Sequence, residues 1–139
     1  MAFASRSFKP LLKQWLQSAL ADVVGFVSPS GTANILPAGT VDTGITASAS
    51  SDQAGATQLN YRISEITVVA TAGDSVKLPQ ADVVGMTMLV VNNDAAESAD
   101  VFPFLGDSIN QLAVNLALAV ANNVATYFIC VAPGRWRSK

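Results

Sequence analysis

The chain has 139 residues, a length typical of a single domain. Half of the residues are hydrophobic and only 13% are charged, against about 25% in an average soluble domain. Because so few charges accompany so many apolar side chains, we expect the surplus apolar surface to be buried between subunits. No run reaches the roughly 18 consecutive apolar residues of a membrane span, so no membrane partner is expected.

The residue types argue against an enzyme. The chain has no His and a single Cys, Cys130, which lies in the apolar run 126–131. Without a base to activate it, this thiol is expected to be a buried hydrophobic group. Asp74 and Asp107 belong to two Gly-Asp-Ser phrases and are expected to bond turn backbone rather than to act as a glycosidase pair. The sequence predicts no catalytic, metal or cofactor site.

Residues 8–24 carry the one convincing helical pattern. Their apolar groups recur every three or four residues and so gather on one face, while Pro10 and Gly25 mark the two ends. This face can pack on its own domain or on a neighbouring subunit. The anchors expected for the second case are Phe8, Leu12, Trp15, Leu16 and Leu20.

A stretch rich in Ala, Ser, Gly and Pro follows, from residue 27 to residue 58. Such residues bury little surface and favour turns or extended chain. A connection of about thirty residues is unusual inside a compact domain, so we expect an extended arm lying on another molecule, or a flexible linker. The short pieces 34–36 and 43–46 can add to a neighbouring sheet as edge strands. The predicted organisation is a helix and arm over residues 1–58 and a β-sandwich domain over residues 59–139.

From residue 59 onward the hydrophobic period changes to two, which is typical of strands. Residues 61–71 are expected to form one long strand. Residues 86–91 and 125–131 are apolar on both faces, as in strands that are covered from two sides. The cleanest alternation lies within residues 114–121. Its larger side chains, Val114, Leu116, Leu118 and Val120, point one way, and the last three are expected to hold the sandwich together.

The fold class follows from these short strands and the turns between them. Seven or eight antiparallel strands with turn signals about every ten residues describe a jelly-roll-like sandwich or a small barrel. A parallel α/β fold is not expected, because no helical segment separates the strands. The prediction is therefore an all-β fold with an N-terminal amphipathic helix and an extended arm.

Charge is distributed unevenly along the chain. Six of the eight cations lie near the two ends, and all ten carboxylates lie between Asp22 and Asp107. Clusters of three cations are weak evidence for nucleic-acid binding, and no direct nucleic-acid contact is expected. Trp136, between Arg135 and Arg137, can stack on a sugar or base, sit in a subunit contact, or tuck into the end of the barrel.

An ordered set of phrases in the second half resembles a module of tailed-bacteriophage virion proteins. The phrases are Gly73-Asp74-Ser75-Val76-Lys77-Leu78-Pro79, Gly85 before a strand ending in Val91-Asn92-Asn93, Val101-Phe102-Pro103, Gly106-Asp107-Ser108-Ile109-Asn110, and Gly134-Arg135-Trp136. Proteins of that group are similar to head decoration (cement) proteins or other structural components that often form trimers. The helix and the Ala/Ser-rich stretch are not part of the match.

The resemblance implies a structural virion protein that is made in the host cytoplasm and occupies the capsid surface. It implies a homotrimer whose partner is the shell of major capsid protein, which it stabilises. On this hypothesis we expect the arm to contact the shell, and Arg135, Trp136 and Arg137 remain a possible interface. The alternative is a tail or fibre component that binds a host glycan through Trp136 and loop residues.

Overall fold

The computed structural model describes residues 41–139, which belong to one compact unit of the chain. Within this part every element is a strand, as the sequence predicts. The predicted helix at residues 8–24 lies outside the described residues. The strands are β1 Val41–Thr46, β2 Thr57–Gln58, β3 Ile63–Val68, β4 Ser75–Lys77, β5 Thr87–Asn92, β6 Ala99–Phe102, β7 Ser108–Ile109, β8 Leu118–Val120, β9 Val124–Ala132 and β10 Arg135–Ser138.

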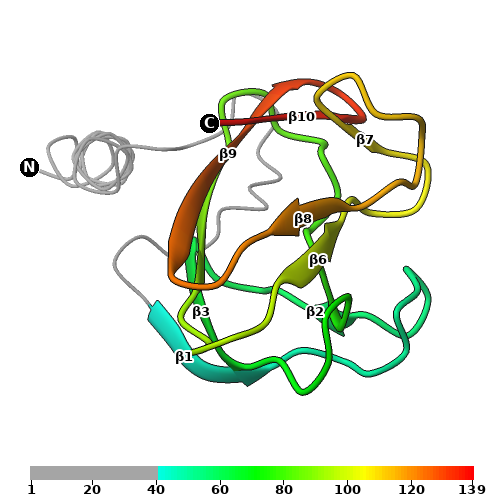
Figure 1. Cartoon of the computed structure of the whole chain (residues 1–139). Coiled ribbons are helices and arrows are strands. Elements are labelled where there is room, and N and C mark those ends of the chain that lie inside the picture. The colour runs from blue at the N-terminus through cyan, green and yellow to red at the C-terminus, as the bar shows by residue number, and fades with distance from the viewer. Residues whose placement is uncertain (1–40) are drawn as a thin grey trace, which may run out of the picture. The chain divides into compact units, whose positions relative to one another are not determined.

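The strands form two sheets. Sheet A has the order β1-β3-β5-β9-β10-β7, and sheet B has the order β2-β4-β6-β8. From β1 to β6 the chain alternates between the two sheets, and β1, β3 and β5 pair in parallel, as do β2, β4 and β6. The chain therefore winds as a β-solenoid of three stacked coils, each made of one strand from sheet A and one from sheet B (Figure 1).

The predicted jelly-roll-like sandwich or small barrel of antiparallel strands is wrong. Two parallel neighbours need a crossover between them, and a helix is its usual form. In a solenoid the strand of the opposite sheet serves as that crossover: β2 lies between β1 and β3, and β4 lies between β3 and β5. Residues 41–58, which the sequence assigns to the arm, supply the first coil through β1 and β2.

The last four strands close one end of the solenoid. β9 pairs antiparallel with β5, and β8 pairs antiparallel with β6, so both strands of the third coil gain a partner on their outer edge. β10 then returns along β9 and pairs in parallel with β7 at the far edge of sheet A. An unpaired strand edge is a template for aggregation, and this antiparallel cap removes it at the third coil.

The core lies between the two sheets. In β5, Met88, Val90 and Asn92 point inward and are almost completely buried, while the residues between them point outward. Phe128 and Trp136 contribute the largest buried side chains from β9 and β10. Sheet B and the loops supply the opposing layer, which includes Leu59, Val76, Leu78 and Val101.

The predicted alternating strand at residues 114–121 forms only in part. The strand is limited to Leu118–Val120, because Asn115 adopts a φ of 67° that no strand residue has. Val114 and Leu116 consequently lie in a loop and are 55% and 52% exposed. Leu116 therefore does not hold the core, whereas Val120 is buried.

Candidate interaction face

The outer surface of sheet A is the most unusual surface of the described chain. Alternate residues of its strands point away from the core, and we call the surface that they form the open face. Its members are Ile63 and Glu65 of β3, Thr87, Leu89 and Val91 of β5, Tyr127, Ile129 and Val131 of β9, Arg135 and Arg137 of β10, and the adjoining Lys139.

Strand register arranges these side chains in rows across the sheet. Leu89 is paired with Ile63 on one side and with Tyr127 on the other. Tyr127 in turn exchanges two backbone hydrogen bonds, each 3.0 Å long, with Lys139. A second row joins Thr87, Ile129 and Arg137. Directly paired residues on one face have neighbouring side chains, so each row ends at a cation on or beside β10, next to Tyr127 in the first row and to Ile129 in the second.

The apolar part of the open face is poorly covered. Tyr127 is 54% exposed, Ile129 40% and Val131 39%, and Val41 at the edge of the sheet is 52% exposed. Single exposed apolar residues are ordinary, but a contiguous group of them marks a contact site. The face is therefore suited to a protein partner.

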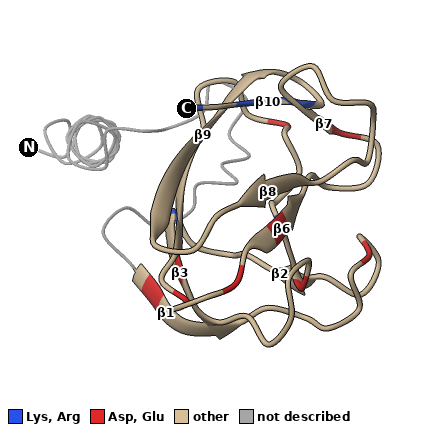
Figure 2. Cartoon of the chain, in the orientation of Figure 1, with Lys and Arg blue, Asp and Glu red and all other residues tan. Residues whose placement is uncertain are grey.

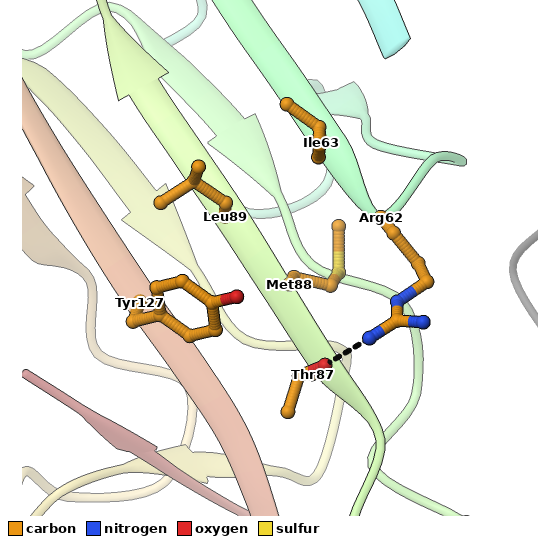
Figure 3. A pocket seen from close by; sticks show the side chains of 6 residues that line it. All are labelled: Arg62, Ile63, Thr87, Met88, Leu89 and Tyr127. Carbon is orange, nitrogen blue, oxygen red and sulfur yellow. Dashed lines mark hydrogen bonds between the residues drawn. The ribbon is translucent and has the colours of Figure 1, made fainter. Parts of the chain in front are cut away.

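A shallow pocket of about 190 Å³ opens within the open face. Figure 3 shows Ile63, Leu89 and Tyr127 along its wall, with Arg62 and Thr87 at one end. The guanidinium of Arg62 donates a hydrogen bond of 2.6 Å to the hydroxyl oxygen of Thr87, which holds the cation beside the apolar wall. The pocket is smaller than the 300–1,000 Å³ typical of small-molecule sites, so it offers a ligand little enclosure.

The cations of sheet A gather mainly on one side. Arg135, Arg137 and Lys139 lie on or beside β10 and are exposed, and Figure 2 shows this basic strand at the capped end. Toward the opposite edge lie Glu65 of β3 and Asp42 of β1. The amide of Asn93 donates a 2.9 Å hydrogen bond to a carboxylate oxygen of Glu65. The open face is thus basic along β10 and apolar in the middle, while its β3 side carries both Glu65 and the guanidinium of Arg62; Asp42, which pairs with the buried Ser64, points to the other face of the sheet.

The predicted interface residues separate into two kinds. Arg135 and Arg137 are exposed on the open face. Trp136 points the other way and is completely buried in the core, where its Nε1 has no hydrogen-bond partner in the described part of the chain. An indole at this position cannot stack on a sugar or a base. The predicted arm anchors Phe8, Leu12, Trp15, Leu16 and Leu20 lie outside the described residues.

Cys130, Asp74 and Asp107 carry groups that could react, and all three residues are buried in the fold. Cys130 is completely buried, as predicted, and burial raises the pKa of its thiol. A carboxylate oxygen of Asp74 accepts hydrogen bonds from the backbone N–H groups of Ala70 and Thr71. Asp107 accepts one of 2.7 Å from the backbone N–H of Ala81, in a loop distant in sequence. Both aspartates are buried; Asp74 bonds its own turn, as predicted, whereas Asp107 joins its turn to another loop.

A second exposed apolar group lies in the loops between β6 and β8. Leu105 is 72% exposed, and it is followed by Gly106, whose backbone N–H donates a 2.7 Å hydrogen bond to the side-chain oxygen of Asn115. This bond fixes the loop around Asn115 beside Gly106, and the flanking Val114 and Leu116 are also exposed. These loop residues do not belong to sheet A.

Sequence reasoning missed the open face as a site, although its signal was present. Residues 86–91 and 125–131 are apolar on both faces, and the structure covers only the inner face of each. The outward side chains of Leu89, Tyr127 and Ile129 therefore form apolar surface that the other described residues do not cover.

Comparison with protein-family models, with curated proteins and with solved structures finds no match to this chain. Among residues 41–139 no group of three or more potential metal ligands is found. The same residues include no helix long and apolar enough to cross a membrane.

Proposed function

We propose that the chain is a structural component of a tailed-bacteriophage particle, a head decoration (cement) protein that binds the capsid shell as a homotrimer. The open face is the observation that carries this proposal, because an apolar surface bordered by basic side chains is suited to assembly with other proteins. The ordered phrases that resemble phage virion proteins support it independently.

Those phrases build the scaffold rather than a reactive site. Gly73 and Gly106 both have a φ of 92°, which a residue with a side chain rarely adopts, and each precedes an aspartate that holds a loop. Gly134 leads into β10, whose Trp136 fills the core. The resemblance therefore concerns residues that give the second and third coils and the cap their shape.

The proposed mechanism is mechanical. A rigid module that contacts other copies and the shell at once adds several interfaces, which all have to separate together when the shell expands under internal pressure. The exposed loop residues Leu105, Val114 and Leu116 provide a second apolar surface away from sheet A. The arm anchors proposed for shell binding are Phe8, Leu12, Trp15 and Leu16.

A second candidate, a tail or fibre component that binds a host glycan, is favoured by one observation. Tyr127 exposes an aromatic ring beside the pocket that contains Arg62 and Thr87, and sugars stack on such rings. The small pocket volume and the burial of Trp136 make this candidate weaker. A glycan array probed with the full chain tests it directly, and binding that is lost in Tyr127→Ala would favour it over the first.

Shell binding is tested with the full chain and with phage shells stripped of it. The wild-type chain should sediment with the shells and raise the temperature at which they release DNA. The variant Leu12→Asp/Leu16→Asp should lose shell binding while the unfolding midpoint of the β-solenoid stays unchanged. Lys13→Ala is the matched control in the same segment. A wild-type chain that stays in the supernatant at every shell concentration contradicts the proposal.

A further inference from the structure

Cations border the apolar centre of the open face on both sides. Arg135, Arg137 and Lys139 lie on or beside β10 and are exposed. On the β3 side the guanidinium of Arg62 donates its 2.6 Å hydrogen bond to Thr87 and so reaches across to β5 (Figure 3). The apolar centre therefore lies between three cations on one side and a guanidinium on the other.

Among the described residues of the open face, Glu65 is the one side-chain carboxylate that accompanies these cations. It pairs with Val91 of β5, one row beyond the row of Leu89, and it accepts a 2.9 Å hydrogen bond from the side-chain amide of Asn93. Within residues 41–139 none of the four cations forms an ion pair. The open face therefore has a surplus of positive charge that a partner with carboxylates can neutralise.

Strand spacing sets the distance across the apolar centre. Thr87, Ile129 and Arg137 are consecutive in one row, on β5, β9 and β10. Since neighbouring strands lie about 4.8 Å apart, the backbones of Thr87 and Arg137 are about 10 Å apart. Three residues of extended chain span about 10 Å. A short segment can thus bring a carboxylate to each side while a side chain between them covers the apolar centre.

We propose that the open face binds an acidic polypeptide segment of a partner protein, in which carboxylates lie on either side of an aliphatic side chain. The carboxylates pair with Arg62 on one side and with Arg137 on the other. The aliphatic side chain enters the pocket of about 190 Å³ beside Tyr127, which has room for one such group. In the proposed function this segment belongs to the capsid shell, and in that respect the inference rests on it.

Arginine is well suited to this role, because its planar guanidinium can bind a carboxylate through two parallel hydrogen bonds. The bond to Thr87 uses one of the five N–H donors of Arg62 and leaves the others for a partner. The same bond holds the guanidinium in place, so less side-chain freedom is lost when a carboxylate binds. Tyrosine and arginine are also the residue types that often dominate the energy of protein interfaces.

A nucleic acid is a less suitable partner for this face. Phosphate groups dominate such contacts, and interfaces with nucleic acid are more polar than those between proteins. The outward side chains of Leu89, Ile129 and Val131 offer nothing to a phosphate backbone, and the carboxylate of Glu65 would repel it. An apolar centre with a charged border is instead the arrangement of a protein interface.

The open face of a second copy is unsuitable as well. If two open faces met, Arg62, Arg135 and Arg137 of one copy would approach the same cations of the other, and like charges at an interface are unfavourable. The homotrimer of the proposed function therefore has to form through other surfaces of the chain. Changes on the open face should leave the mass of the oligomer unaltered.

Peptide titration of the full chain, followed by NMR of its backbone amides, tests the contact. The probe is a synthetic peptide with a leucine between glutamates, and the control peptides carry glutamine or lysine for glutamate, or alanine for leucine. The probe should shift amides of β3, β5, β9 and β10, and each control should bind about tenfold more weakly. Raising the salt from about 0.05 M to about 0.5 M should weaken the probe's binding. No shift at millimolar probe, shifts confined to sheet B, or equal binding of the lysine peptide would overturn the inference.

Variants of the chain identify the groups that bind. Arg62→Gln and Arg137→Gln should each weaken binding of the acidic peptide about tenfold. Lys77→Gln is the matched control: it removes the same charge from β4 of sheet B and should bind as the wild type does. Tyr127→Ala should remove the preference for leucine over alanine in the peptide. Wild-type affinity in Arg62→Gln/Arg137→Gln would overturn the inference.

Two measurements on the same variants exclude indirect effects. Urea unfolding verifies that the β-solenoid is intact in each variant. Native mass spectrometry should give the same oligomer mass for Arg62→Gln/Arg137→Gln as for the wild type. A folded double variant that dissociates would assign the open face to the contact between copies and overturn the inference.

Stripped shells separate this inference from the proposed function. Loss of both peptide and shell binding in Arg62→Gln/Arg137→Gln supports the inference and assigns the acidic segment to the shell. Peptide binding by a chain that never binds shells supports the acidic site while contradicting the cement function. Shell binding that persists in the double variant overturns the inference and leaves the cement function standing. A single-stranded oligonucleotide that binds the open face more tightly than the acidic peptide also overturns it.

Discussion

The side-chain amide of Asn92 donates a hydrogen bond of 3.0 Å to the backbone carbonyl oxygen of Val120. Asn92 ends β5, the strand of the third coil in sheet A, and Val120 ends β8, the strand that caps sheet B. The same amide donates a 2.9 Å bond to the carbonyl of Glu97, in the turn that leads to β6. One buried side chain thus connects the third coil to the cap.

Replacing Asn92 should destabilise the fold measurably. Asn92→Ala leaves the carbonyls of Val120 and Glu97 without this donor in a buried setting, and such a loss costs about 1–3 kcal/mol. Urea unfolding measures it. Asn93→Ala, which removes an exposed amide next in the chain, is the control and should change stability by less than about 0.5 kcal/mol. Equal effects at the two positions would refute a special role for Asn92.

The fold should tolerate Asp107→Asn but should be destabilised by Asp107→Ala. Asp107→Ala leaves the buried N–H of Ala81 without an acceptor and should cost about 1–3 kcal/mol. Asp107→Asn keeps an acceptor and avoids burying a charge, so at pH 7 its free energy of unfolding should equal or exceed that of the wild type.

The difference in stability between Asp107→Asn and the wild type should change with pH in a defined direction. Burial raises the pKa of Asp107 above its ordinary value of 3.8, against the lowering effect of the Ala81 N–H. The contribution of the raised pKa to stability is complete below pH 3.8 and is lost as pH rises through the folded-state pKa. Asp107→Asn should therefore gain on the wild type between pH 3 and pH 7, in unfolding curves measured at both. A constant difference would contradict the assignment.

Asp94 should have the opposite pH dependence. Its carboxylate accepts hydrogen bonds from the backbone N–H groups of Ala96, Glu97 and Val69, and these bonds lower its pKa below the ordinary 3.8. The stability that it contributes is therefore present above pH 3.8 and declines as the pH falls through the folded-state value. In Asp94→Asn the loss of stability on acidification should be shallower. Parallel acid unfolding curves for the two chains would show that Asp94 plays no part.

Trp136 should affect stability, whereas its two neighbours should not. Trp136→Ala removes the largest completely buried side chain and should cost about 3–5 kcal/mol. Trp136→Phe should cost less, because Nε1 makes no hydrogen bond within the described residues. Arg135→Ala and Arg137→Ala should stay within about 0.5 kcal/mol of the wild type in urea unfolding. A stable Trp136→Ala chain would contradict the burial of the indole.

Several elements follow directly from residue patterns. The apolar runs 86–91 and 125–131 match β5 and β9 to within two residues at each end. Cys130 is buried, and the Gly73-Asp74 phrase forms a turn in which Asp74 bonds nearby backbone groups. Each of these features depends on local chemistry, which short stretches of sequence contain.

The stacking of coils could not be predicted from the residue patterns, for a physical reason. A period of two describes a strand with one buried face, whether its neighbour runs parallel or antiparallel. The turn phrase at Gly73-Asp74 reads as a hairpin turn, but the structure places it at a corner where the chain passes from sheet A to sheet B. Only long-range pairing, such as Ile63 with Leu89, distinguishes the two folds.

The open face was recognisable only in combination with the fold. Because β5 is apolar on both faces, it is expected to be covered on both faces. The sequence does not show which of the two faces packs against the core. The sequence does indicate the basic residues Arg135 and Arg137 as part of a possible interface. Their separation from Glu65 by two intervening strands is a property of sheet order alone.

The central claim is that this chain works on the outside of a phage shell by assembling with its own copies. Cryo-electron microscopy of purified particles with and without the chain tests it most directly. The account predicts added density repeated over the shell surface, in clusters of three solenoids. Density confined to the tail or to a single vertex, or no difference between the particles, would contradict it.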